Sequence, residues 1–281
     1  EFCELFQFYL EKPNVNQSFH VLMIISSAFN NISRYFNVDE NVTIEMIEKI
    51  IELYSFALED NFENKLISRF TDFLQILKDK TNKTIISLLF EYKLPLEFYQ
   101  ILLNSQSFKN NSLYFFAFIT KFIDEKDFLL LKEFFDYKTF LDLMIDSKNP
   151  SSFKLSYAFL ILENMMKYDI ELLEMVASDD FLIFIMKCFN DGEFIIKYSA
   201  GRCLFSALSA ATIQSLEVIK KLFSSEIMLI ALDIFETDTP DLIIQILRVF
   251  DCLLSRLRDV ADGDEMEFYE LFEERFLQIL D

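Results

Sequence analysis

The sequence predicts an all-α fold in the form of a right-handed α-solenoid, a superhelix of stacked helical repeats. An apolar helical pattern returns about every 41 to 46 residues, which is the spacing of two- and three-helix repeats. Only 3 Gly and 4 Pro occur among 281 residues, which are too few turn residues for a sheet-rich or β/α fold. Hydrophobic residues make up 52% of the chain, so it can bury a large core.

The repeats are delimited by polar breaks. Each unit is expected to contain two shorter apolar helices, then a polar break, and then a longer amphipathic helix. Five segments that open the longer helices can be aligned by these breaks. They begin at Glu63, Lys109, Pro150, Gly192 and Thr239.

The individual helices follow from apolar spacing at three- and four-residue steps. Pro95 and Pro240 fall in first turns, where a missing N–H costs nothing. Asp179 and Asp180 precede another helix, where carboxylates favour the positive end of the helix dipole. Helices are expected over residues 1–12, 19–36, 44–57, 65–77, 84–91, 96–103, 112–123, 126–135, 140–145, 153–166, 170–176, 181–189, 194–209, 213–223, 226–235, 242–257 and 265–280.

Three helices per unit, the first short and the last longest, resemble the armadillo repeat. The best match is the segment from Phe181 to Ser209. It contains a short apolar helix, the turn Asn190-Asp-Gly, and then Tyr198-Ser-Ala-Gly-Arg-Cys-Leu-Phe-Ser-Ala-Leu, which is similar to that family's third helix. The armadillo Gly between the first two helices is absent from every unit, and HEAT repeats, with two helices per unit, remain an alternative.

The domain organisation follows from this resemblance. It implies one helical-repeat domain over residues 1–281, containing about five to six armadillo-like repeats over residues 43–258. Residues 1–42 are expected to form irregular N-terminal helices. Residues 259–281 carry nine acidic residues against one Arg, and we interpret them as a capping helix with one apolar and one strongly polar face.

If the units stack as in the armadillo family, the third helices line a concave groove. Polar residues on those helices are then the candidate contacts for a partner. Several are cationic, which suggests that the groove is less negative than the convex side. The candidate residues are Lys65, Arg69, Asn111, Tyr114, Lys154, Tyr157, Lys197, Arg202, Gln245 and Arg248.

The formal net charge of −20 limits the classes of partner. Such a field repels nucleic-acid phosphates and anionic membrane surfaces, so we expect neither nucleic-acid binding nor membrane insertion. It favours a protein or peptide partner of basic character, or it keeps a hydrophobic chain soluble.

The sequence contains few residue patterns that are typical of catalytic sites. A nucleophilic triad or dyad would have to use His20, the single histidine, which has no spaced partner. The glycines Gly192, Gly201 and Gly263 are too scattered for a phosphate-binding loop. The four cysteines form no metal-binding pattern, so we expect buried free thiols in a reducing compartment, the cytoplasm or the nucleus. We therefore expect no catalytic residues, no cofactor and no metal.

The leading hypothesis is a non-enzymatic scaffold or adaptor that holds a peptide or protein partner on its concave face. One alternative is a regulatory subunit or cochaperone that acts on an enzyme through a terminal or convex surface. Another is a structural segment of a larger solenoid protein.

Overall fold

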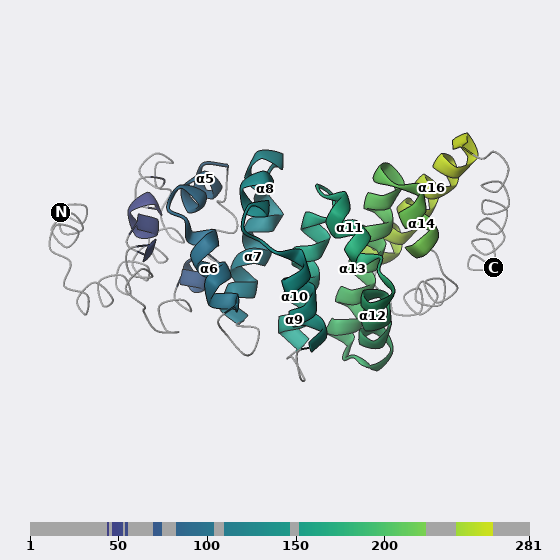
Figure 1. Cartoon of the computed structure of the whole chain (residues 1–281), viewed down its shortest axis with the longest axis horizontal. Coiled ribbons are helices and arrows are strands. Elements are labelled where there is room, and N and C mark those ends of the chain that lie inside the picture. Colours follow the sequence, from purple (N-terminus) through teal and green to yellow (C-terminus); the bar gives the residue numbers. More distant parts are fainter. Residues whose placement is uncertain are drawn as a thin grey trace, which may run out of the picture. The chain divides into compact units, whose positions relative to one another are not determined.

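The computed structural model describes residues 44, 47–52, 54–55, 70–74, 83–103, 110–146, 152–222 and 240–260. Every regular element within these residues is a helix, as the sequence predicts (Figure 1). The chain divides into two compact units, residues 1–135 and residues 136–281, and each is treated separately below. The N-terminal helices, the acidic C-terminal segment after residue 260 and the helix expected over 226–235 lie outside the described residues. The single domain over residues 1–281 remains a prediction.

In the first unit, a helical triplet follows two partly described helical segments at 44–55 and 70–74. Its three helices pack against one another, and the third is the longest at 13 residues, as predicted. Pro95 is the second residue of its helix. The helices of this unit are α5 (Lys83–Glu91), α6 (Leu94–Leu103), α7 (Asn110–Phe122) and α8 (Glu125–Lys132).

Buried aromatic rings form the core of the first unit. The Phe98 ring of α6 stacks on Phe115 of α7, with centroids 4.1 Å apart and planes 12° apart. Phe70 contacts both of these rings, and the Tyr54 ring lies 4.5 Å from that of Phe70. Because each large ring buries 150–250 Å² of mostly apolar surface, this chain of contacts fixes α6 and α7 onto the preceding helices.

The second unit contains the most regular triplet of the described residues. α11, α12 and α13 have 7, 13 and 21 residues, which is the predicted order of increasing length. Each of the three packs against the other two. The helices of this unit are α9 (Tyr137–Asp146), α10 (Ser152–Met165), α11 (Ile170–Val176), α12 (Asp179–Asp191), α13 (Phe194–Gln214), α14 (Leu216–Leu222) and α16 (Pro240–Val260).

Polar bonds join α10 and α13 at both ends of the pair. At the beginning of α10, the Ser152 hydroxyl donates to Oε2 of Glu193, the residue before α13, at 2.5 Å. At the other end, the Gln214 amide donates to the backbone carbonyls of Met166 and Lys167 at 3.3 and 3.2 Å. Carbonyls at a helix end lack intrahelical partners, so Gln214 satisfies groups that α10 itself leaves open.

A buried tyrosine connects α9 to the beginning of α11. The Tyr137 hydroxyl donates to Oδ2 of Asp169 at 2.8 Å, and both residues are buried. Oδ1 of Asp169 accepts from the backbone N–H of Glu171, so Asp169 is the N-cap of α11. Burial, followed by the hydrogen bond to Asp169, raises the pKa of Tyr137 above its ordinary range. The phenol therefore stays protonated and remains the donor to Asp169.

Most predicted boundaries agree with the structure to within about three residues, but α13 does not. The sequence predicts its end at Ser209, whereas the helix continues to Gln214 and α14 begins at Leu216. No Gly or Pro occurs between these residues. The helix ends at Ser215, whose backbone is extended with φ −155° and ψ 120°.

Gly192 separates α12 from α13 and leaves no room for a side chain. A Cβ at this position would lie 2.2 Å from the carbonyl oxygen of Cys188 and 2.9 Å from the Ile196 side chain. We expect Gly192→Ala to lower the free energy of unfolding by about 1–3 kcal/mol, because this backbone contact requires a local shift. Urea denaturation measures the change.

Ser178→Ala, at the other end of α12, is the matched control. Ser178 is the N-cap, but its side chain makes no capping hydrogen bond, so its loss should cost less than about 0.5 kcal/mol. Equal effects of the two substitutions would contradict the steric argument.

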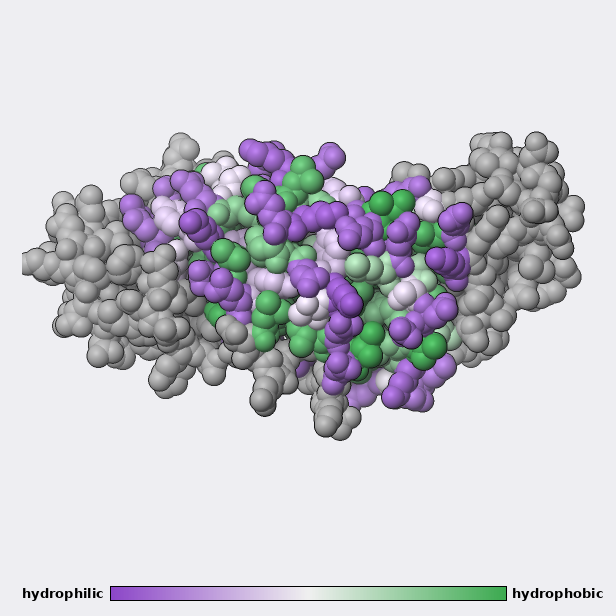
Figure 2. Space-filling model, viewed as in Figure 1, coloured by the Kyte–Doolittle hydropathy of each residue, from purple (hydrophilic) through white to green (hydrophobic). Residues whose placement is uncertain are grey.

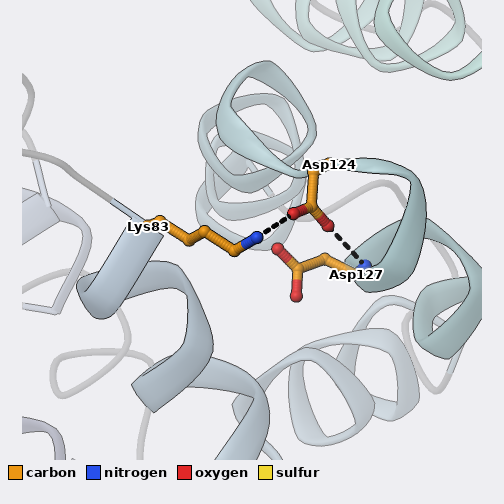
Figure 3. Close-up of polar contacts among 3 residues, drawn as sticks. All are labelled: Lys83, Asp124 and Asp127. Carbon is orange, nitrogen blue, oxygen red and sulfur yellow. Dashed lines mark hydrogen bonds and ion pairs between the residues drawn. The ribbon is translucent and has the colours of Figure 1, made fainter.

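Two carboxylates and a lysine meet where α7 leads into α8 (Figure 3). Asp124 is the N-cap of α8 and accepts from the backbone N–H of Asp127 at 3.0 Å, while Lys83 of α5 donates to its other oxygen. The hydrogen bond from Lys83, followed by that from Asp127, lowers the pKa of Asp124. Burial, followed by repulsion from Asp124, raises the pKa of Asp127. Burial and repulsion thus raise the pKa of Asp127 by more than the α8 dipole and Lys83 lower it.

This raised pKa predicts a pH-dependent effect of Asp127→Asn. Since the folded chain holds the Asp127 proton more tightly than the unfolded chain, ionisation of Asp127 destabilises the fold above the raised pKa. The penalty disappears below the unfolded value of about 3.9. We expect Asp127→Asn to raise the urea midpoint at about pH 7 and to leave it nearly unchanged at about pH 3. Asp142→Asn, at an exposed position on α9, is the control, and an equal gain at both pH values would disprove the assignment.

Candidate functional site

The longest helices of the second unit each carry a stripe of exposed or half-buried residues. α13 packs against both α10 and α16. On each helix, exposed or half-buried residues recur at three- and four-residue steps. We call these three stripes together the third-helix face. It consists of Phe153, Tyr157, Leu160 and Asn164 on α10, Ile195, Tyr198, Arg202, Ser206 and Ser209 on α13, and Ile244, Arg248 and Cys252 on α16.

A ladder of stacked side chains runs along α13 at four-residue steps. The Phe194 ring stacks on Tyr198, with centroids 6.3 Å apart and planes 25° apart. The guanidinium carbon of Arg202 lies 5.8 Å from the centre of the Tyr198 ring, within cation–π range. Nη2 of Arg202 then donates to Oε1 of Glu163 on α10 at 2.5 Å. The ladder therefore extends from one end of α13 to a neighbouring third helix.

The electrostatics of this ladder keep Arg202 charged. Burial opposes its protonation, but attraction and hydrogen bonding to Glu163 prevail, and the pKa of Arg202 is raised. The two side chains are 34% and 17% exposed, so the pair is screened less than a surface salt bridge. Nε of Arg202 is buried without a hydrogen-bond partner among the described residues. The Arg202 guanidinium is thus held at one edge by the Glu163 carboxylate and on one face by the Tyr198 ring.

The structure brings several of the predicted contact residues onto the third-helix face. Tyr157 and Arg202 are half-buried members of it, and Arg248 is exposed. Lys154 flanks the face on α10. Gln245 lies in α16, but its side chain is outside the described residues.

Other predicted contact residues lie elsewhere. Asn111 and Tyr114 are half-buried on α7 of the first unit. Lys197 precedes Arg202 by five residues, which is about 140° around a helix, so the two do not point in the same direction. Lys65 and Arg69 lie outside the described residues.

Sequence reasoning missed Phe194 and Glu163, and it quoted Tyr198 without assigning it to the site. The four-residue spacing of Phe194, Tyr198 and Arg202 is a signal that predicts stacking on one helix. Glu163 has no such signal, because it is 39 residues from Arg202 and its role depends on how α10 packs against α13.

The expectation of buried thiols is correct for two cysteines and wrong for one. Cys188 and Cys203 are buried, and burial raises the pKa of Cys188 to about 11. Cys252 is exposed on α16, because it follows Arg248 by four residues and lies on the same stripe. Its apolar sequence context therefore does not reflect burial. Cys3 lies outside the described residues.

Apolar side chains reach the surface in several places. In Figure 2, hydrophobic patches lie between hydrophilic side chains on the visible face of the described residues. Large exposed apolar residues of the second unit include Phe153 and Phe194 on third helices and Ile183 on α12. Separate exposed apolar residues of this kind are normal, and only their grouping with polar partners indicates a site.

The described residues contain neither a metal-binding cluster nor a membrane-spanning helix. Among the described residues, no cluster of three or more His, Cys, Asp or Glu side chains could hold a metal ion. None of the helices in this part of the chain combines the length and apolar character needed to cross a membrane. His20 lies outside the described residues, so its surroundings are not described.

Comparisons with known proteins identify the fold. No protein-family model and no curated protein matches the sequence. A designed armadillo repeat protein matches the structure with a TM-score of 0.66 over 90% of this chain and 100% of its own, at 15% identity. A designed armadillo repeat protein in complex with peptide (KR)4 matches with a TM-score of 0.66 over 90% and 99% of the chains, at 14% identity. The chain has an armadillo-like α-solenoid fold.

A third armadillo structure agrees. Computationally designed armadillo repeat proteins for modular peptide recognition match with a TM-score of 0.56 over 80% of this chain and 99% of theirs, at 14% identity. The predicted armadillo resemblance and the all-α solenoid class are therefore confirmed. At these identities the likeness concerns the backbone alone and does not extend to the residues of the third-helix face.

The Arg202–Glu163 pair is expected to couple α10 to α13. Glu163→Gln leaves a half-buried guanidinium without its anion and should lower the free energy of unfolding by about 1–2 kcal/mol. A double-mutant cycle with Arg202→Gln should give a coupling energy of about 1 kcal/mol in urea denaturation.

Glu174→Gln, at an exposed position on the neighbouring α11, should change the stability by less than about 0.5 kcal/mol. If the effects of Glu163→Gln and Arg202→Gln are simply additive, the pair does not connect the two helices.

Proposed function

We propose that this chain is a non-enzymatic scaffold that binds a peptide or a flexible segment of a partner protein along its third-helix face. The observation that carries the proposal is the composition of that face. On α10 and α13, Tyr157, Tyr198 and serines lie along stripes that also carry exposed or half-buried apolar groups, and the adjacent α16 adds Ile244, Arg248 and Cys252. Aromatic side chains offer large contact area at low entropic cost, and hydroxyls offer adaptable hydrogen bonds.

The geometry is compatible with an extended ligand. Neighbouring helix axes lie about 8–10 Å apart, and an extended chain rises about 3.3 Å per residue, so about three residues correspond to one helix step. A peptide crossing α10, α13 and α16 would make modest contacts with each. A face held by packed helices adds little ordering cost of its own on binding.

The proposed partner is basic. The formal net charge of −20 attracts cationic chains over distances up to the Debye length. One solved armadillo neighbour is in complex with the peptide (KR)4, and this supports the same chemical class here. Glu163 offsets Arg202 on the third-helix face and leaves only the charge of Arg248, so stacking and hydrogen bonds would supply most of its specificity.

Selection from a displayed library of random peptides tests this proposal. Peptides of about ten residues are long enough to cross three helices. We expect selected peptides to be enriched in Lys and Arg. They should bind Tyr157→Ala/Ile244→Ala at least tenfold more weakly than the unmodified chain, as measured by fluorescence anisotropy.

The control is Ile183→Ala, which removes an exposed side chain of α12 outside the third-helix face. It should change binding by less than about twofold, and circular dichroism should show that all variants are folded. Peptides that bind but respond to Ile183→Ala and not to Tyr157→Ala/Ile244→Ala would exclude the proposed face. They would instead favour a partner on the outer helices, as in the regulatory-subunit alternative.

A further inference from the structure

The ladder on α13 ends in an open aromatic ring. Tyr198 lies between Phe194 and Arg202, which are one helical turn away on opposite sides of it along the helix. Phe194 stacks on Tyr198, yet it remains 59% exposed in the first turn of α13. One end of the ladder is thus closed by a guanidinium and the other faces solvent.

A carboxylate and a second exposed ring lie at the open end. The hydrogen bond from Ser152 to Oε2 of Glu193 brings the beginnings of α10 and α13 together. Phe194 follows Glu193 in the chain, and Phe153, 60% exposed, follows Ser152. We call Phe153, Glu193 and Phe194 the ring edge. A carboxylate has about four lone-pair positions, so the bond from Ser152 leaves Glu193 able to accept further hydrogen bonds.

The closed end of the ladder shows which chemistry these groups accept. There, the guanidinium of Arg202 stacks on an aromatic ring and donates to a carboxylate. The ring edge offers the same two elements, exposed aromatic rings and the Glu193 carboxylate, but the chain provides no described guanidinium to them. We propose that the ring edge binds the guanidinium of an arginine side chain from the partner peptide, an inference that rests on the proposed peptide-binding function.

The local charges explain why arginine should be preferred to lysine. Lys154 and Lys197 lie in the first two turns of α10 and α13, and Asp191 and Glu193 lie just before α13, so their charges nearly cancel. The positive end of the α13 dipole also disfavours a cation. A compact, strongly hydrated ammonium gains little at such a place. A guanidinium is planar and weakly hydrated, so it gains from stacking on the rings as well as from the bond to Glu193.

The experiment compares two blocked peptides of equal length and charge, one of alternating Arg and Ser and the other of alternating Lys and Ser. Fluorescence anisotropy with the full chain at about 0.15 M salt measures both affinities, where charges beyond about 8 Å are screened. We expect the Arg peptide to bind about five- to tenfold more tightly, from stacking on two exposed rings. In Phe153→Ala/Phe194→Ala the Arg peptide should bind more weakly while the Lys peptide is unaffected. The affinities of the two peptides should then agree within about twofold.

Two further variants make the assignment specific. Glu193→Gln removes the anion and keeps the shape, so it should weaken binding of both peptides and leave a residual Arg preference. Ile183→Ala, on α12, should leave the preference unchanged. Equal binding of the two peptides by the unmodified chain, absence of binding of the Arg peptide, or an Arg preference that survives Phe153→Ala/Phe194→Ala would each overturn the inference.

The results separate this inference from the proposed function. Library peptides that depend on Tyr157 and Ile244 but show no enrichment of Arg over Lys would leave the third-helix face as the binding site and exclude the ring edge. An Arg preference that requires Phe153 and Phe194, with binding unaffected by Tyr157→Ala/Ile244→Ala, would establish the ring edge and exclude an extended groove.

Discussion

The close packing of α13 against its neighbours is the constraint on which the second unit depends. This helix contacts α10, α11, α12, α14 and α16. Such crowding requires small side chains, and Ala200, Ala207, Ala210 and Ala211 are all buried, as is Gly201. Since the distance between two helices is set by the side chains at their contact, these residues bring α10 and α16 close to α13. The third-helix face exists because this packing directs the larger polar side chains of α13 to one side.

The helices could be predicted because their apolar spacing is local information. The range 170–176 was predicted without error, and α13 shows why other limits were missed. Its C-terminal extension carries no breaking residue, so nothing in the sequence distinguishes Ser209 from Gln214 as an end. The last turn of α13 makes a tertiary contact, because the Gln214 side chain donates hydrogen bonds to carbonyls at the end of α10. Contacts between residues nearly fifty positions apart cannot be derived from periodicity.

The candidate site was predictable to a similar extent. Helical phase alone was enough to place Tyr157, Arg202 and Arg248 on an outward stripe, because these residues interrupt apolar runs. Lys197 lies about 140° around the helix from Arg202, because an error in phase of one or two residues moves a side chain to another side of the helix. Helical phase also could not assign Phe194 to the surface, since in a chain with 34 Phe most rings are expected to fill the core. Whether a large apolar residue is exposed depends on how its helix packs, so it is seen in the structure and not in the sequence.

The acidity of the chain and the ladder on α13 would act at different stages of binding. The net charge of −20 belongs to the chain as a whole, with nine acidic residues against one Arg in residues 259–281, and its field mainly affects how fast a basic partner arrives. The Arg202–Glu163 pair removes most of the charge from the centre of the third-helix face, so the field contributes little once the partner is seated. Stacking and hydrogen bonds are less sensitive to salt than exposed charge pairs. Added salt should therefore slow association more strongly than it speeds dissociation, and the choice between side chains should persist at salt concentrations that already weaken binding.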